Sequence, residues 1–213
     1  MPLPTLDPMA LRVLGALLEK QMSTPEYYPL TLSALVNACN QSSNRDPVMR
    51  LDESTVLEAL ELLREEQLAW EVRGAGSRTT KYEHRLRERF ELTEQESAVL
   101  CELMLRGPQT PGELRSRTQR LYAFQDLSEV EAALDCLASG SEPLASKLPR
   151  QPGSREACFA QLLGGSEDPR ATQPLGELPG LEAPPSLRQE VAALRAELAS
   201  LRADFEAFRR QLE

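Results

Sequence analysis

The densest group of cationic side chains in this sequence lies between Arg73 and Arg89, and such a group suits contacts with phosphate. Six basic residues and the single histidine fall within this stretch. Lysine and arginine bind nucleic acids chiefly by neutralising backbone phosphates, so a duplex is a natural partner. We predict nucleic-acid contacts from this stretch and from the polar loop upstream of it, through Asn44, Arg45, Arg50, Arg73, Arg78, Lys81, His84 and Arg85.

The same cations also allow a plainer interpretation, a solvated hairpin whose charge is balanced by neighbouring acids. Glu71, Glu83 and Glu88 are interleaved with the basic residues and could pair with them. A second basic group is predicted either to share a face with the first or to form a solvated helix paired with Glu113. Its members are Arg106, Arg115, Arg117 and Arg120.

Nucleophilic and metal chemistry find little support in the sequence. Cys39, Cys101, Cys136 and Cys158 form no C-x-x-C pair, and His84 is the only histidine, which leaves too few ligands for a zinc site. The sequence has no glycine-rich phosphate loop and no second histidine for a catalytic triad. We therefore expect no metal, no cofactor and no enzymatic activity, and we expect reduced thiols in a cytoplasmic protein.

An acidic helix followed by a hairpin would position the basic stretch. A helix that begins near Asp52 should turn Val56, Leu57, Leu60 and Leu63 inward, because these residues have helical spacing. Residues 70–73 and 79–83 favour two strands on either side of a turn that contains glycine. Two shorter helical patterns precede this helix, and three helices that end in a hairpin are typical of a winged helix-turn-helix domain.

The same order of helices recurs in the second half of the sequence, which indicates an internal repeat. The apolar set Val99, Leu100, Leu103 and Met104 matches Val13, Leu14, Leu17 and Leu18, and Val130, Ala133, Leu134 and Leu137 match Val56, Ala59, Leu60 and Leu63. Capping boxes at residues 93–96 and 110–113 start two of the repeated helices. Thr110 is matched here with Thr24, Ser128 is expected to cap the next helix, and residues 147–159 should form a weaker hairpin.

We therefore predict a mostly α protein with short β-hairpins, an α+β fold made of two tandem winged helix-turn-helix domains. The domains span residues 1–90 and 91–165. Residues 166–185 are rich in glycine, proline and acids and should form a flexible linker.

The last segment, residues 186–213, has the heptad spacing of a coiled coil. Opposite charges at the flanking positions favour a parallel dimer, although the apolar stripe could instead fold back on one of the domains. The apolar seam consists of Leu187, Val191, Leu194, Leu198, Leu201, Phe205, Phe208 and Leu212.

Three segments of unusual composition resemble the signature segments of the YceH-like family of bacterial proteins. They are residues 40–49, 81–85 and 106–117, and the resemblance covers roughly residues 5–163. The resemblance implies a tandem winged-helix fold, and it implies neither catalytic residues nor a cofactor.

Charge separates two candidate functions. The net charge is −9, and acids such as Asp52, Glu53 and Glu58 occupy the start of the helix that usually enters the major groove. Carboxylates repel phosphates, so we predict that double-stranded DNA is contacted through the first hairpin and the adjoining loop instead. The alternative is an acidic adaptor that binds a protein partner and no DNA. The sequence shows neither a signal peptide nor a membrane-spanning stretch, so we expect no membrane contact.

Overall fold

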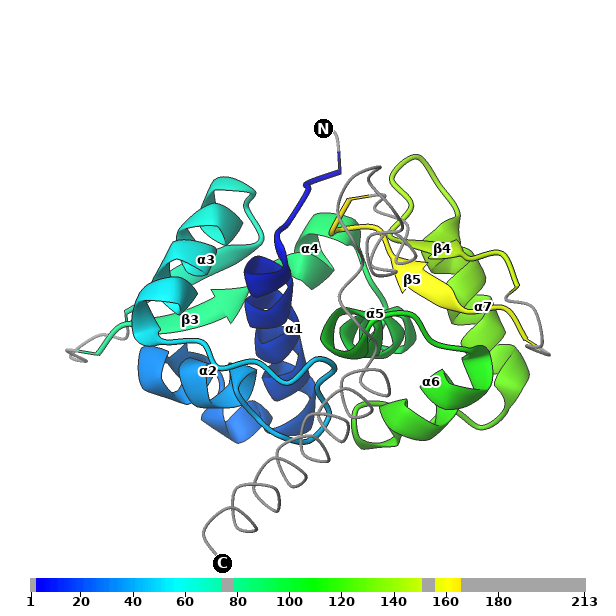
Figure 1. Cartoon of the computed structure of the whole chain (residues 1–213), viewed down its shortest axis with the longest axis horizontal. Coiled ribbons are helices and arrows are strands. Elements are labelled where there is room, and N and C mark those ends of the chain that lie inside the picture. Colours follow the sequence, from blue (N-terminus) through cyan, green and yellow to red (C-terminus); the bar gives the residue numbers. More distant parts are fainter. Residues whose placement is uncertain (1–2, 74–78, 151–155, 166–213) are drawn as a thin grey trace, which may run out of the picture. The chain divides into compact units, whose positions relative to one another are not determined.

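The computed structural model describes residues 3–73, 79–150 and 156–165 (Figure 1). Residues 1–167 form one compact unit, and residues 168–213 form another that lies outside the described residues. Within the described residues the fold is mixed, with helices and two small antiparallel sheets, which confirms the predicted combination of helices and hairpins. The predicted linker and coiled coil, at 166–185 and 186–213, lie outside the described residues. The predicted boundary near residue 90 stays a prediction.

The first half of the compact unit contains three helices and a three-stranded sheet. The strands lie in the order β1-β3-β2, so β3 is central and β2 forms one edge. The elements are α1 (Pro8–Ser23), the 3-10 helix η1 (Pro25–Tyr27), β1 (Leu30–Thr31), α2 (Leu32–Cys39), α3 (Glu53–Glu65), β2 (Ala69–Val72) and β3 (Lys81–His84).

The second half has a similar order of elements but a smaller sheet. Its two strands pair antiparallel, and Gln109 adds an isolated bridge to Phe159 at the place that β1 occupies in the first half. The elements are α4 (Leu86–Phe90), α5 (Glu94–Arg106), α6 (Pro111–Arg117), the 3-10 helix η2 (Thr118–Arg120), α7 (Leu127–Ala138), β4 (Ala145–Lys147) and β5 (Phe159–Gln161).

Helix starts follow the local capping signals. The Asp7 side chain accepts the N–H of Ala10 at the start of α1, and Asp52 accepts the N–H of Thr55 at the start of α3. Both predicted capping boxes are present, at Thr93 and at Thr110. The prediction for α7 was wrong, because Asp126 caps this helix and Ser128 lies inside it. Both are good capping types, and the Ser128 hydroxyl donates to the Asp126 carboxylate.

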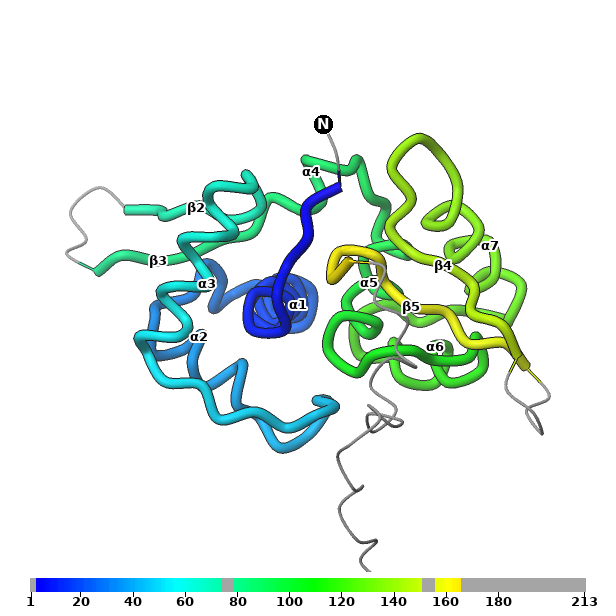
Figure 2. Tube along the Cα trace, turned by 45° about the horizontal axis from the view of Figure 1, so that its top comes forward, coloured from blue at the N-terminus to red at the C-terminus, as the bar shows by residue number. Residues whose placement is uncertain are grey.

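The repeated apolar sets form the core that was predicted for them. All four matched positions are buried in α3 and in α7, and the same holds for α1 and α5. Figure 1 and Figure 2 show α1 and α5 side by side between the two groups of elements. The thiol of Cys101 on α5 donates to the carbonyl oxygen of Gly15 on α1 at 3.6 Å, so the two halves share one core at this contact.

A glycine permits this close approach of α1 and α5. A Cβ atom added at Gly15 would lie 2.9 Å from the Cδ2 atom of Leu105 and 3.3 Å from the Cβ atom of Met104. Leu105 is fully buried, so it has little room to move away. The missing side chain therefore sets how closely these helices can pack.

Three details of the predicted repeat need correction. Thr110 corresponds to Thr31, not Thr24, because each caps the second helix of its half; η1 and the segment before β1 are extra in the first half. The returning strand of the second hairpin was expected at residues 157–159, and it is β5 at Phe159–Gln161, two residues later. Leu57 was expected in the core, but 42% of it is exposed.

Candidate binding groove and the buried charge cluster

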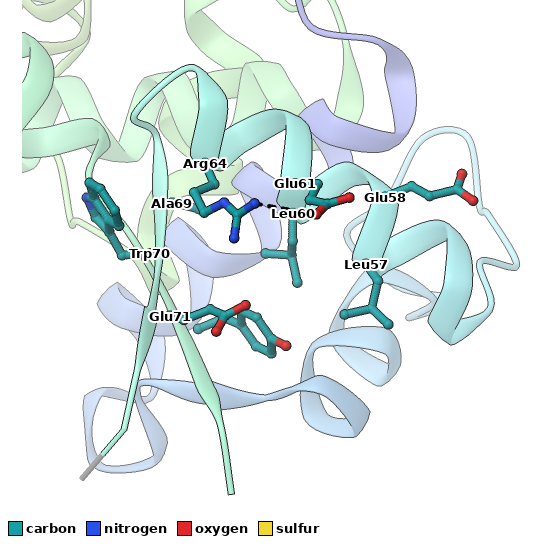
Figure 3. Close-up of a pocket in the computed structure, with 9 residues that line it drawn as sticks. Leu57, Glu58, Leu60, Glu61, Arg64, Ala69, Trp70 and Glu71 are labelled. Atoms are coloured by element: carbon teal, nitrogen blue, oxygen red, sulfur yellow. Dashed lines mark hydrogen bonds and ion pairs between the residues drawn. The ribbon is translucent and has the colours of Figure 1, made fainter.

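A groove lies between helix α3 and the edge strand β2, and it encloses about 310 Å³. We call it the α3–β2 groove. Figure 3 shows Leu57 and Leu60 pointing from the helix toward the strand, with Glu58 turned outward and Trp70 at the far side of the strand. Its lining residues are Leu57, Glu58, Leu60, Glu61, Arg64, Ala69, Trp70, Glu71 and Tyr82.

The α3–β2 groove combines exposed apolar surface with an acidic rim. Leu57 is 42% exposed and Trp70 is 44% exposed, so two large apolar side chains of neighbouring elements reach the surface here. Three carboxylates, those of Glu58, Glu61 and Glu71, form this rim. Arg64 lies 3.4 Å from Glu61 and Arg73 lies 3.9 Å from Glu71, so the three acids outnumber the two guanidinium groups beside them.

Sequence reasoning missed this groove. The helical pattern assigned Leu57 to the core together with Val56, although two adjacent residues of a helix point about 100° apart. The available signal was an apolar stripe on α3 that is wider than one buried face requires. The lone tryptophan on a short edge strand was the second signal.

The cations predicted to contact DNA do not form one exposed group. Arg73 is exposed, but its guanidinium lies 3.9 Å from the Glu71 carboxylate, and Arg85 lies 2.9 Å from Glu83. Arg50 is exposed, Lys81 is half-buried on β3, and Arg78 lies outside the described residues. The described cations of the first hairpin are therefore interleaved with acids.

Two predicted contacts need correction, because burial removes them from the surface. Arg45 is 5% exposed and His84 is 2% exposed. The Nε2 atom of His84 lies 2.8 Å from the side-chain oxygen of Gln21, and the backbone N–H of Leu86 donates to its Nδ1 atom. Burial, with the positive charges of Arg87 and Arg85, lowers the pKa of His84 to about 4, so the ring is neutral at pH 7.

Arg45 belongs to a central charge cluster at the contact between the two halves. The cluster unites two fully buried carboxylates with three guanidinium groups, and it consists of Glu19, Arg45, Glu102, Arg106 and Arg120. Arg45 binds Glu19 with two nitrogens, at 3.0 and 2.5 Å. Arg120 binds both carboxylates, and Arg106 lies 3.0 Å from Glu102.

The central charge cluster joins residues that are far apart in the sequence. Arg120 reaches from the second half to Glu19 in the first half, and Arg106 donates to the side chain of Asn44. Asn44 has a φ of 59°, a left-handed conformation that asparagine tolerates better than most residues. This backbone conformation directs the next residue, Arg45, inward to Glu19.

The second basic group is therefore divided between two environments. Arg106 and Arg120 belong to the central charge cluster, together with Arg45 and next to Asn44, and not to a face shared with the first hairpin. Arg117 lies 3.1 Å from Glu113, as the plainer interpretation expected. Arg115 donates to the backbone oxygen of Gln125 at 2.7 Å.

Ion pairing favours the charged forms of Glu19 and Arg120 in the central charge cluster. Burial alone would raise the pKa of Glu19, but the hydrogen bonds and charges of Arg45 and Arg120 outweigh it, so its pKa lies below the ordinary value. Burial alone would lower the pKa of Arg120, and the charges of Glu19 and Glu102 raise it instead. Removing one of these groups would leave a desolvated partner without a counter-charge, which is strongly destabilising.

The start of α3 carries fixed negative charge. Hydrogen bonds from the backbone N–H and hydroxyl of Thr55 and from the hydroxyl of Ser54 lower the pKa of Asp52 to about 2. This carboxylate is consequently ionised at any ordinary pH. Phosphates brought to this end of the helix would meet a negative charge.

The two buried cysteines have environments that suit packing and not reactivity. Burial raises the pKa of the Cys39 thiol to about 12, and it raises that of Cys101 well above the ordinary value. Both thiols stay protonated and are poor nucleophiles. Within the described ranges, no group of three histidine, cysteine or acidic residues could hold a metal ion. No helix among the described residues is both long and apolar enough to cross a membrane.

Comparison with known proteins places most of this chain in one family. Residues 6–154 match the family described as "Protein of unknown function, DUF480". A UPF0502 protein of Opitutus terrae is 54% identical over 90% of this chain and 84% of its own length. Another, from Solibacter usitatus, is 50% identical over 98% of both chains, and one from Citrifermentans bemidjiense is 58% identical over 77% of this chain and 76% of its own.

Proposed function

The chain belongs to the DUF480 family of bacterial proteins, and we propose that it is a non-enzymatic adaptor that binds a basic segment of a partner protein in the α3–β2 groove. The observation that carries this proposal is the groove itself, which places exposed Leu57 beside a mainly acidic rim, with exposed Trp70 on the other face of the same strand. An apolar anchor beside an excess of one sign of charge is suited to a partner segment with a complementary pattern.

In this proposal each half of the compact unit is a winged helix-turn-helix domain. Three helices followed by an antiparallel hairpin support this interpretation, as does the repetition of the buried positions in α3 and α7. The central charge cluster and the contact of α1 with α5 would hold the two domains as one body. A rigid body of this kind suits a scaffold, because it presents its groove in a fixed direction.

Charge is the reason why the adaptor is preferred over the DNA-binding alternative. A duplex needs a cluster of cations that are available to phosphates. Here Arg45 is buried against Glu19, while Arg73 and Arg85 each lie near an acid of the same hairpin. Arg50 and Lys81 remain as possible phosphate contacts, so DNA binding through the first hairpin is the second candidate.

The segment at 186–213 enters the proposal as a parallel coiled coil that makes the protein a dimer. A dimer would carry two α3–β2 grooves, and two binding sites on one molecule raise the apparent affinity for a partner that carries two binding segments.

Titration of two labelled ligands with the full chain tests this proposal. One ligand is a short DNA duplex, and the other is a short peptide with alternating lysine and leucine; both are followed by fluorescence anisotropy at several salt concentrations. We expect the peptide to bind more tightly than the duplex, and Glu58→Gln together with Glu61→Gln to weaken its binding. Duplex binding that exceeds peptide binding and falls steeply with salt would overturn the adaptor in favour of DNA.

A further inference from the structure

The outer edge of β2 offers backbone groups beside the α3–β2 groove. Within the described residues β2 has one neighbouring strand, β3, and their register pairs Glu71 with Tyr82. Just before the strand, the N–H of Arg85 donates to the carbonyl of Leu68 at 2.7 Å. Antiparallel ladders alternate, so Trp70 and Val72 turn their backbone groups to β3, whereas Glu71 turns its N–H and C=O outward.

The groove and this strand edge lie next to each other. Ala69, Trp70 and Glu71 line the groove on the strand side, and Leu57 and Leu60 line it on the helix side. A volume of about 310 Å³ is at the small end of ligand sites. It is therefore suited to one or two anchoring side chains of a longer segment that continues along the strand.

We propose that an extended basic segment of a partner protein adds to the outer edge of β2 as a further strand. This inference rests on the proposed adaptor function and specifies how the partner is held. Main-chain hydrogen bonds to Glu71 provide affinity, as in other cases of strand addition to a sheet edge. Alternate side chains of the added strand enter the groove against Leu57, and basic side chains meet the carboxylates of Glu58 and Glu71.

Charge favours a basic partner segment over a second copy of this chain. Two β2 edges paired with each other would bring the acidic residue Glu71 of each copy close to the other, and like charges on paired strands are destabilising. A charged residue on an edge strand also prevents unspecific strand pairing. Glu71 thus opposes self-pairing through β2 and at the same time attracts lysine or arginine.

The tryptophan on β2 gives a direct measurement of this binding. Trp70 is the only tryptophan in the chain, it is 44% exposed, and it lines the α3–β2 groove. A strand added at the edge should change its emission. Titration of the full chain with the lysine–leucine peptide can therefore be followed without a label on either molecule.

Backbone methylation of the peptide separates strand addition from simple charge attraction. A peptide with N-methyl groups on the residues that face β2 keeps its charges and side chains but loses the main-chain donors. We expect its affinity to fall about tenfold or more, because each methylated residue loses a main-chain hydrogen bond to β2. Methylation on the opposite, outward-facing amides is the matched control and should leave the affinity nearly unchanged.

Variants of Glu71 test the same contact from the protein side. Glu71→Gln removes only the charge, whereas Glu71→Pro also removes the outward N–H, a change that edge strands tolerate. We expect Glu71→Pro to bind the unmethylated peptide more weakly than Glu71→Gln does. Circular dichroism establishes that both variants fold, and the methylated peptides test the proposal on the unaltered chain if the proline variant does not.

The outcomes distinguish this inference from the proposed function. Binding could depend on Glu58 and Glu61 and yet be unchanged by methylation of the peptide and by Glu71→Pro. This outcome would overturn strand addition but not the proposed adaptor function. No binding of any basic peptide would overturn both. A concentration-dependent increase in mass that Glu71→Gln enhances and that blocks the peptide would show that a second copy occupies the edge.

Discussion

The two halves of the compact unit share a buried framework but present different surfaces beside their third helices. Position by position, the repeat matches Leu57 with Glu131, and it matches Trp70 and Glu71 with Ser146 and Lys147. The corresponding hollow in the second half encloses about 340 Å³, and its charged lining residues are Glu131, Asp135, Glu156, Lys147 and Arg150. It sets two cations against three acids, whereas the α3–β2 groove has one cation against three, and Glu131 and Ser146 stand where the groove has exposed Leu57 and Trp70.

This difference teaches that burial and function constrain different positions of the same repeat. The four inward positions of α3 and α7 are apolar in both halves, because each must fill a core of similar shape. Positions that face outward do not have to fill the core, and the residues there differ in size and charge between the two halves. The first half consequently has an exposed leucine beside a mainly acidic rim, which is the combination that the proposed partner segment needs.

The largest expected effect concerns the central charge cluster, to which the first half contributes Arg45 and the second half contributes Arg106 and Arg120. Replacing Arg45 by methionine would remove the main counter-charge of buried Glu19 and should lower the free energy of unfolding by about 3–5 kcal/mol. Replacing Arg120, whose side chain is 31% exposed, should cost less, about 1–3 kcal/mol. Urea denaturation of both variants measures this order.

A matched control for these variants is Arg50→Met, because Arg50 is exposed. This change should alter stability by about 0.5 kcal/mol or less. If Arg120→Met lowered the free energy of unfolding as much as Arg45→Met does, the expected difference between the arginines of the two halves would be wrong.

The next effect is a pH dependence of stability that comes from His84, the only histidine in the chain, which lies in the first half. Its folded pKa of about 4 lies below the unfolded value of 6.5, so the unfolded chain binds the extra proton between these values. The contribution of His84 is complete above about pH 6.5 and is lost as the pH falls, which should cost about 3 kcal/mol by pH 4.

Denaturation of the unaltered chain and of His84→Gln at both ends of this range isolates the histidine. The variant should lose less stability on acidification than the unaltered chain, because it lacks the histidine that takes up the extra proton on unfolding. The loss that remains comes from carboxylates such as Glu19, which both proteins share. Parallel loss of stability in the two proteins would show that His84 is not responsible.

A smaller effect follows from exchanging the residues that differ between the two halves. Leu57→Glu gives the first half the residue that its counterpart carries, and it should weaken binding of the lysine–leucine peptide about tenfold or more through lost apolar contact. Stability should change little, because Leu57 is half-exposed. Tryptophan fluorescence titration measures the affinity.

The reciprocal variant, Glu131→Leu, serves as the control for this exchange. It leaves the α3–β2 groove intact and should not alter peptide binding there. Equal weakening by both variants would mean that the peptide does not distinguish the two halves.

Local signals made much of the fold predictable from the sequence. The buried stripe of α3 and the capping boxes at Thr93 and Thr110 depend on residues within one or two helical turns, so spacing alone identifies them. Leu57 was misassigned because periodicity gives a direction around the helix but not the width of the neighbouring element that covers it.

The central charge cluster could not be predicted in the same way. Arg45 and Glu19 are 26 positions apart, and Arg120 and Glu19 are 101 positions apart, so no local pattern relates them. A polar loop rich in asparagine and arginine resembles an exposed phosphate contact when its buried partners are unknown. Sequence reasoning therefore placed Arg45 on the surface, although it lies in the centre of the compact unit.

The contact between Cys101 and Gly15 also joins equivalent positions of the two halves. The N-caps of α1 and α5, Asp7 and Thr93, are 86 positions apart, and so are Gly15 and Cys101. Equivalent positions that touch one another are the mark of an isologous interface around a two-fold axis. Gly15 and Cys101 therefore meet as equivalent subunits of a symmetric dimer do at their axis, within a single chain.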